Sequence, residues 1–251
     1  MTGALPALGS VGAVGFEVEF LTTGGTLVRR DISAAWDVPF EVVDRPVRSF
    51  RSYRGQRSYS GWWWMASSAR HVGYESWLER DNVMVLDADP DVAAVVSQPF
   101  RLWWRDGAKP RPRRHVPDYF VRRADGGVLI LDVRADDRIE DDDAALFAAT
   151  EAACRAVGWD YRRVGVVDPV LAANLRWLAG YRHPRNRIEP AAAELIQVFT
   201  APRAMFDGAS EVGDRIAVLP TLFHLLWTGE LITDMTVRFD GSAAVTSRRP
   251  A

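Results

Sequence analysis

Apolar and polar positions along the chain follow two rhythms, one typical of strands and one typical of helices. Residues 12–32 alternate weakly, and Gly24-Gly25 between two apolar runs predicts a hairpin of two strands. From Gly73 the apolar positions recur every three or four residues, which predicts a helix that ends at Asp89-Pro90. Strands and helices are therefore expected to mix within the first hundred residues.

Three strand-like runs follow this helix, at residues 92–104, 116–122 and 128–134. Asp125-Gly126-Gly127 separates the second run from the third and predicts a tight hairpin turn. Asp118 begins the second run and Asp132 ends the third, so the hairpin would place both carboxylates at one end. This expected closeness is the main physical argument for a shared site.

The second half of the chain is more helical. Acidic residues at 136–143 precede an alanine-rich helix that ends at Gly158, as suits the helix dipole. A strand at 161–167 and a helix at 169–180 complete an α/β unit over residues 1–183, with the N-terminal β-hairpin included. The polar stretch 183–187 marks a boundary. Helices near 190–199, 203–212 and 219–229, with two short β runs around Asp240-Gly241, predict a winged-helix-like unit over residues 184–251.

Composition narrows the class of protein. The chain has 251 residues, 48% of them hydrophobic, and a formal net charge of −2. Cys154 is the lone cysteine, so disulfides and cysteine metal clusters are excluded. There is no run of about 18 apolar residues and no charged segment typical of a signal peptide at the N-terminus. We therefore expect a soluble, cytoplasmic, bacterial protein without a membrane partner.

Local patterns suggest contact with nucleic acid. Arginines alternate with aromatic residues between 46 and 71, and we expect Arg51, Arg54 and Arg57 to contact DNA phosphates. The alternative is a loop whose aromatic side chains pack on the core and whose arginines are solvated. Gln98, beside Pro99, is expected at the site edge, although a polar residue at a strand bulge fits equally. His115 precedes the VPD motif, where a phosphate-touching or solvent-facing role outweighs a general-base role.

Carboxylates provide the candidate chemistry. Hard divalent ions such as Mg²⁺ prefer oxygen ligands, and a bound ion can activate a water for attack on phosphorus. Asp118 and Asp132 are the expected direct ligands, with the Val133 carbonyl as another and Glu75 holding a bound water or a second ion. Such acid triples also arise by chance in a chain with 33 acidic residues. However, both aspartates have apolar neighbours, and buried carboxylates need a cation, either a metal or Arg134.

Several motifs together resemble a known family. They are FRSYRGQRSYSGWWW, HVGYESWLERDNVMVLDADPDV, VSQPF, HVPDYF and LILDVR. They look like the TnsA-like endonuclease subunit of heteromeric transposases, in the PD-(D/E)xK nuclease superfamily. The resemblance covers residues 12–180, most specifically 48–134. It implies a restriction-endonuclease-like core, a mixed sheet flanked by helices.

The resemblance also implies an activity and partners. The activity is Mg²⁺-dependent hydrolysis of one DNA strand at transposon ends, with Mn²⁺ expected to substitute for Mg²⁺. The implied partners are transposon-end DNA, a DDE-type transposase subunit that cuts the other strand, and an AAA+ regulator ATPase contacted through the C-terminal region.

One residue departs from the family pattern. By position, Glu75, Asp118 and Asp132 are the acidic site residues, and Arg134 stands where the superfamily has lysine. Arginine keeps its proton in proteins, so it cannot act as a base, although it can hydrogen-bond a phosphate through two N–H groups. Lys109 lies in the loop-like KPRPRR stretch and is not expected to replace it. Two alternatives remain: a non-catalytic subunit bridging DNA and partners, or a stand-alone restriction or repair nuclease.

Overall fold

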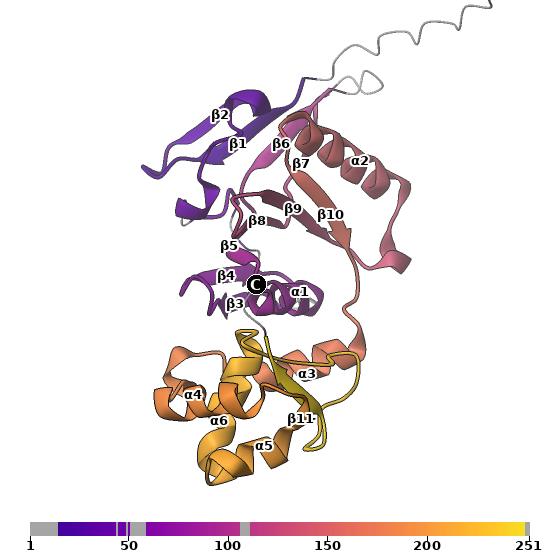
Figure 1. Ribbon diagram of the computed structural model, residues 1–251. Helices are drawn as coiled ribbons and strands as arrows, with labels where there is room; N and C mark the ends of the chain where they lie inside the picture. The colour runs from indigo at the N-terminus through magenta and orange to yellow at the C-terminus, as the bar shows by residue number, and fades with distance from the viewer. Residues whose placement is uncertain (1–14, 44, 49, 51–58, 106–110, 249–251) are drawn as a thin grey trace, which may run out of the picture.

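The computed structural model describes residues 15–43, 45–48, 50, 59–105 and 111–248. Figure 1 shows a β-rich upper part, a middle part around α1 (Trp77–Ala88) and a helical lower part. The chain is thus α/β, as predicted. None of the helices in the described ranges has the length and apolar run needed to span a bilayer.

A mixed four-stranded sheet lies at the centre of the molecule. It consists of β5 (Val92–Ser97), β8 (Tyr119–Arg123), β9 (Val128–Val133) and β10 (Asp160–Val164), in the order β10-β9-β8-β5. β9 and β10 are parallel, and the other two pairings are antiparallel. The predicted β8–β9 hairpin is confirmed, and α2 (Asp141–Ala156) packs against β10.

Alternating side chains on these strands supply two separate cores, as expected for a sheet covered on both faces. Phe120 and Ile130 belong to a core completed by α2 residues, including Cys154, and by the N-terminal sheet. Tyr119 and Leu131 belong to a second core with α1 residues, including Val83. Because both faces of the inner strands β8 and β9 are covered, their charged side chains, Arg122, Arg123 and Asp132, lie near the strand ends.

The N-terminal sheet has the order β2-β1-β6-β7. Its strands are β1 (Glu17–Leu21), β2 (Leu27–Asp31), β6 (Arg101–Trp104) and β7 (Arg113–His115), and the predicted β1–β2 hairpin is confirmed. Short 3₁₀ turns at Ile32–Ala34 and Phe40–Val42 follow β2. The single strand predicted at 92–104 is wrong: β5 and β6 lie in different sheets. Gln98 adopts φ +49° before Pro99, which has no N–H to donate, and the strand breaks there.

A hairpin precedes α1 where the sequence pattern indicated only a loop. β3 (Gly61–Trp64) pairs with β4 (His71–Tyr74), so the predicted helix start at Gly73 is wrong. The helix begins at Trp77, because the Ser76 side chain accepts a hydrogen bond from the Glu79 backbone N–H. Glu75 therefore lies in the connection before the helix. The Ser-x-x-Glu pattern at 76–79 is the sequence signal of this cap.

The lower part contains α3 (Pro169–Ala179), α4 (Glu189–Val198), α5 (Met205–Val212) and α6 (Arg215–Trp227), with a 3₁₀ turn at Pro184–Asn186. Another 3₁₀ turn, Asp136–Arg138, precedes α2 in the upper part. Three short strands, β11 (Arg203–Ala204), β12 (Leu231–Thr233) and β13 (Ala244–Ser247), form a sheet in the order β11-β13-β12. β12 and β13 pair, but ten residues separate them, so Asp240-Gly241 is not a tight hairpin turn. One core joins Met84 of α1 and Leu178 of α3 to these helices across the predicted boundary at 183/184.

Phe40 lies at the centre of the upper core and provides a stability test. It is 1% exposed, and its ring contacts those of Phe20, Phe100, Phe120 and Trp159 at centroid distances of 5.3–6.1 Å. Phe40→Ala should lower the free energy of unfolding by about 3–5 kcal/mol. Trp36→Ala, at a side chain 57% exposed, should change it by less than about 0.5 kcal/mol. Chemical denaturation of both variants checks the ranking.

Candidate functional site

A polar pocket opens where the hairpin β8–β9 faces the start of α1 and the strands β6 and β7. Its volume is about 640 Å³. It is lined by four acids (Glu79, Asp118, Asp132, Asp143), by Arg48, Arg101, Arg114, Arg134 and His115, and by Val116, Val133 and Phe147. Residues from six separate parts of the chain therefore meet here, although only the β8–β9 pair is local in sequence.

Asp118 and Asp132 meet at one end of the β8–β9 hairpin, as predicted. Asp118 lies one residue beyond the Tyr119–Leu131 pair, and its backbone N–H donates to Asp132 Oδ1 at 3.3 Å. Asp118 Oδ2 accepts a hydrogen bond from the Val133 backbone N–H at 2.7 Å. The Asp118 carboxyl group is surrounded by protein atoms, although the residue as a whole is partly exposed.

Asp132 is held by several donors. It is 1% exposed, and His115 Nε2 lies 2.9 Å and 3.0 Å from its two carboxylate oxygens. The Tyr161 hydroxyl donates to Oδ2 at 2.8 Å. Such donors fix the direction of a carboxylate and resemble the outer-shell partners that orient metal ligands. Tyr161 had no distinguishing signal in the sequence, because only the parallel pairing of β10 with β9 brings it to Asp132.

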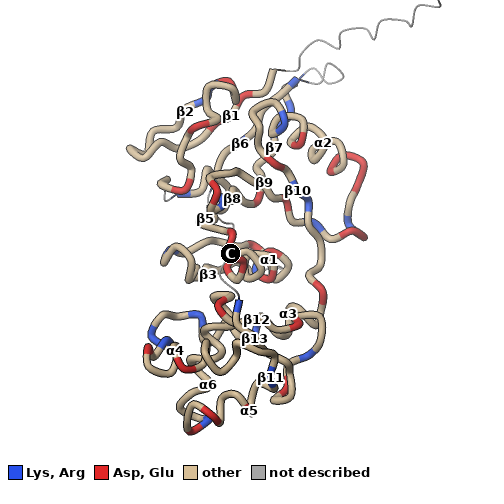
Figure 2. The backbone as a smooth tube through the Cα atoms, in the orientation of Figure 1, with Lys and Arg blue, Asp and Glu red and all other residues tan. Residues whose placement is uncertain are grey.

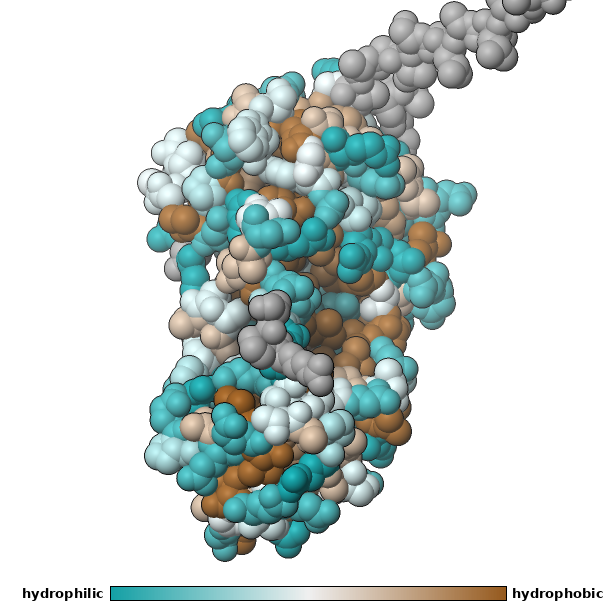
Figure 3. Space-filling view, in the orientation of Figure 1, coloured by the Kyte–Doolittle hydropathy of each residue, from teal (hydrophilic) through white to brown (hydrophobic). Residues whose placement is uncertain are grey.

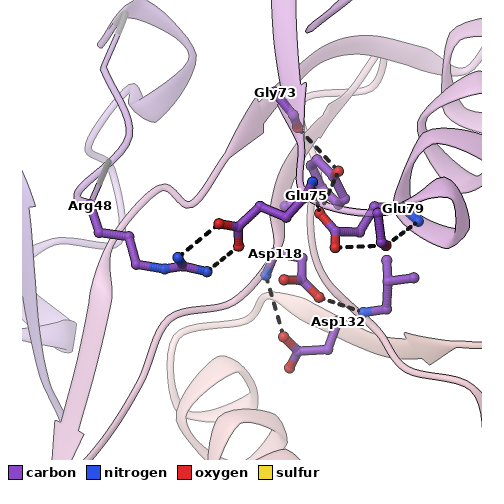
Figure 4. A network of polar contacts seen from close by, with 9 residues as sticks. Arg48, Gly73, Glu75, Glu79, Asp118 and Asp132 are labelled. Atoms are coloured by element: carbon purple, nitrogen blue, oxygen red, sulfur yellow. Dashed lines mark hydrogen bonds and ion pairs between the residues drawn. The ribbon is translucent and has the colours of Figure 1, made fainter. Parts of the chain in front are cut away.

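Glu79, rather than Glu75, lines the pocket beside Asp118. The Glu75 carboxylate instead forms a two-point ion pair with Arg48, with Nη1 3.0 Å from Oε1. Glu79 accepts from the Glu75 backbone N–H at 2.7 Å and from the Ser76 hydroxyl at 2.9 Å. Figure 4 shows Glu75 directed toward Arg48, while Glu79 and Asp118 lie near each other. The sequence analysis named Glu75 as the site glutamate at the start of a helix, whereas the structure places Glu79 in the pocket lining and pairs Glu75 with Arg48.

Burial and neighbouring negative charges raise the proton affinity of Asp118 and Glu79. Burial raises the pKa of Asp118 well above its usual value, and the charges of Asp132 and Glu79 raise it further. Burial likewise raises the pKa of Glu79. The Arg48 guanidinium opposes the rise in pKa at both carboxyls. The pocket thus holds more negative charge than its partners neutralise, an arrangement that suits a bound cation.

Cations surround the acids on two sides. Arg101 forms an ion pair with Glu19. The guanidinium groups of Arg101 and Arg114 both lie over the Trp103 ring, at 6.0 Å and 5.7 Å respectively from its centroid. Arg134 is exposed; its Nη2 donates to Asp143 at 2.9 Å and its Nε to the Arg138 carbonyl at 3.1 Å. The structure therefore places Arg134 at the pocket wall but directs its hydrogen bonds away from Asp118 and Asp132.

The remaining predicted residues divide into three groups. Arg51, Arg54, Arg57 and Lys109 lie outside the described residues. His115 lines the pocket through its contact with Asp132. Gln98 is 2% exposed and does not line the pocket; its backbone N–H donates to the Asp118 carbonyl at 2.8 Å. The Cys154 thiol is buried with a pKa raised to about 12, which excludes it as a thiolate nucleophile near neutral pH.

The oxygen atoms that line this site are of the type that a hard divalent ion prefers as ligands. Glu79, Asp118, Asp132 and the Val133 carbonyl offer the oxygen ligands that Mg²⁺ prefers. Within the residues that the structure describes, no three histidine, cysteine or acidic side chains are already grouped as a metal site. His115 and Tyr161 lie against Asp132 instead. The charge imbalance at Asp118 is the observation that favours a cation there.

Comparison with known proteins gives no further information on identity. No family model matches the chain. No curated protein matches it either.

The raised pKa of Asp118 predicts that this side chain destabilises the ion-free protein near neutral pH. A carboxyl whose pKa rises on folding reduces stability as the pH increases from its unfolded pKa through its folded pKa. Asp118→Asn removes this charge and keeps an acceptor for the Val133 N–H, so it should raise Tm at pH 7.5 in chelator. The gain should disappear near pH 4, where the unfolded carboxyl also holds its proton. Scanning calorimetry checks this, with Asp137→Asn at an exposed site as control; an unchanged or lower Tm at pH 7.5 would contradict it.

Proposed function

We propose that this chain is the DNA-cleaving subunit of a heteromeric transposase, a divalent-ion-dependent endonuclease that cuts one strand at transposon ends. The observation that carries the proposal is the group of Glu79, Asp118 and the buried Asp132 at one end of a mixed sheet, in a pocket that four arginines also line. Buried acids next to cations are the combination that phosphodiester hydrolysis requires.

The order of elements supports a restriction-endonuclease-like core. The segment α1–β5–β8–β9–α2–β10 runs helix–strand–strand–strand–helix–strand, which is the order that the resemblance implies. A short strand pair, β6–β7, is inserted between β5 and β8, and it belongs to the N-terminal sheet. The carboxylates lie at the end of β8–β9, where the resemblance places the acidic site.

The lower part supports a winged-helix-like unit with a protein partner. The order α4–β11–α5–α6–β12–β13, with β13 central in the sheet, is that of a winged helix. However, α6 is buried from Thr221 to Trp227, and residues 184–251 carry seven arginines against eight acids, so this unit has no excess of positive charge. Figure 2 shows red acidic positions among these helices, and Figure 3 shows brown apolar surface over them. This composition suits an AAA+ regulator or a transposase subunit better than a phosphate backbone.

The residues of the pocket have different roles in the proposed hydrolysis. Glu79, Asp118, Asp132 and the Val133 carbonyl would hold Mg²⁺ or Mn²⁺, which when bound lowers the pKa of water and offsets charge on the phosphate. His115 and Tyr161 hold Asp132 in one orientation. Arg101 and Arg114 face the DNA backbone. Water forms the new bond to phosphorus, the bond from phosphorus to O3′ breaks, and a 3′-hydroxyl and a 5′-phosphate result.

Metal binding tests the acidic group without partner proteins or cognate DNA. Titration of Mn²⁺ into the purified protein by calorimetry should detect binding that Asp118→Ala abolishes. Glu79→Gln should weaken it by at least about tenfold, whereas Glu75→Gln should change it by no more than about threefold, since only Glu79 faces Asp118. Equal losses in the two glutamate variants would contradict the assignment of Glu79.

Strand cleavage tests the function itself. With Mg²⁺ or Mn²⁺ and the transposase partner, the protein should nick one strand of a transposon-end duplex, and Asp118→Ala should remove the activity while the circular dichroism spectrum stays the same. Full activity in Asp118→Ala would contradict the site. DNA and partner binding that survive in Asp118→Ala, with no cleavage by the unaltered protein, would support the non-catalytic bridging subunit. Cleavage of arbitrary duplexes without a partner would support a stand-alone nuclease.

A further inference from the structure

We propose that Arg48, held in place by Glu75, is the cation that contacts the phosphate at this site, and that Arg134 is not. The inference rests on the proposed function, because it names the residue that meets the substrate phosphate in the same pocket. It gives Arg48 a binding role and makes Glu75 a positioning residue.

Backbone hydrogen bonds connect the segment that contains Arg48 to Asp118. The Val47 N–H donates to the Gln98 carbonyl at 2.9 Å, and the Gln98 N–H donates to the Asp118 carbonyl at 2.8 Å. Gln98 therefore links the segment that contains Arg48 directly to the residue before β8. This connection is long in sequence, since Val47 and Asp118 belong to different parts of the fold.

The backbone of Gln98 is adapted to this link. Its φ of +49° is uncommon for a residue with a side chain, and such conformations persist where the surroundings fix them. The side chain is buried, and its Oε1 has no hydrogen-bond partner among the residues that the structure describes. Both features cost stability, yet they let one residue bond the Arg48 segment on one side and Asp118 on the other. We therefore interpret Gln98 as a scaffold of the site rather than as a DNA contact.

Glu75 fixes the direction of the Arg48 guanidinium. Two N–H groups of Arg48, on Nη1 and Nη2, bond the two oxygens of Glu75. An arginine has five N–H donors, so three remain for a ligand, and they belong to a rigid planar group. Arg48 lines the pocket with Glu79 and Asp118 and lowers the pKa of both carboxyls through its charge. Figure 4 shows Arg48 and Glu75 approaching the pair Asp118–Asp132 from one side.

Arg134 is engaged elsewhere. Its Nη2 bonds Asp143, which also caps the start of α2, and its Nε bonds the Arg138 carbonyl. Its side chain is 44% exposed, against 35% for Arg48. Moving Arg134 toward Asp118 would break both hydrogen bonds, whereas Arg48 already lines the pocket with the carboxylates and, among the described residues, bonds only Glu75.

Binding of a 30-base-pair duplex, followed by fluorescence anisotropy in Ca²⁺ at several salt concentrations, gives the first test. Arg48→Gln should reduce the slope of log affinity against log salt by about one, because one phosphate contact is lost. Arg134→Gln and the exposed control Arg155→Gln should leave the slope unchanged. The double variant R48Q/E75Q removes the pair together, so a fold defect from an unpaired Glu75 is separated from loss of the contact.

Cleavage kinetics with Mg²⁺ give the second test. Arg48→Gln should lower kcat by about 100-fold or more, Arg48→Lys should recover part of it, and Arg134→Gln should cost less than about fivefold. Glu75→Gln should lower kcat with Mn²⁺ affinity retained, which a metal ligand would not allow. An unchanged salt slope in Arg48→Gln, or a larger loss in Arg134→Gln, would overturn the inference.

The two tests separate the inference from the proposed function. If the unaltered protein binds DNA but never cleaves it, the nuclease proposal fails. The change in salt slope in Arg48→Gln then tests by itself whether Arg48 contacts a phosphate. If the unaltered protein binds no DNA, both proposals fail.

Discussion

The candidate site depends on one constraint, the burial of two carboxylates at the same end of the β8–β9 hairpin. Asp118 and Asp132 approach so closely that the backbone N–H of one residue bonds the carboxylate of the other. Burial and mutual repulsion both disfavour this arrangement, and Glu79 adds a third negative charge. The surrounding structure offsets the repulsion with His115, Tyr161, the Val133 N–H and Arg48. The site is therefore stabilised by groups from separate elements, while its own carboxylates oppose folding.

The second constraint is the break at Gln98-Pro99. Without this break, residues 92–104 would continue as one strand, and the Asp118 carbonyl would lose the hydrogen bond from the Gln98 N–H. With it, β5 stays in the central sheet and β6 joins the N-terminal sheet, so that Arg101 of β6 lines the pocket. The same break lets Gln98 bond both Val47 and Asp118. A local backbone conformation thus links the N-terminal segment to the start of the β8–β9 hairpin.

The two halves of the molecule differ in what surrounds their pockets and helices. Arginines gather around the pocket, and several of them are bonded to carboxylates, as Arg101 is to Glu19. The side chains of that pair are 21% and 15% exposed, and the pairing holds the Arg101 guanidinium near the pocket. The lower part contains a buried apolar helix, α6. We infer that nucleic acid meets the upper part and that protein meets the lower part.

The sequence by itself determined the local features: the α/β class, the β1–β2 and β8–β9 hairpins, most helices, and the meeting of Asp118 with Asp132 across a tight turn. These depend on short-range periodicity and turn chemistry, which a single chain displays directly. Tertiary structure alone decided which glutamate faces the pocket, that Tyr161 holds Asp132, and that Arg134 bonds Asp143 while Arg48 lies beside the acids. Those outcomes require pairing between distant segments, and no local pattern encodes it. The one missed local signal was the Ser76–Glu79 cap, which moves the helix start past Glu75.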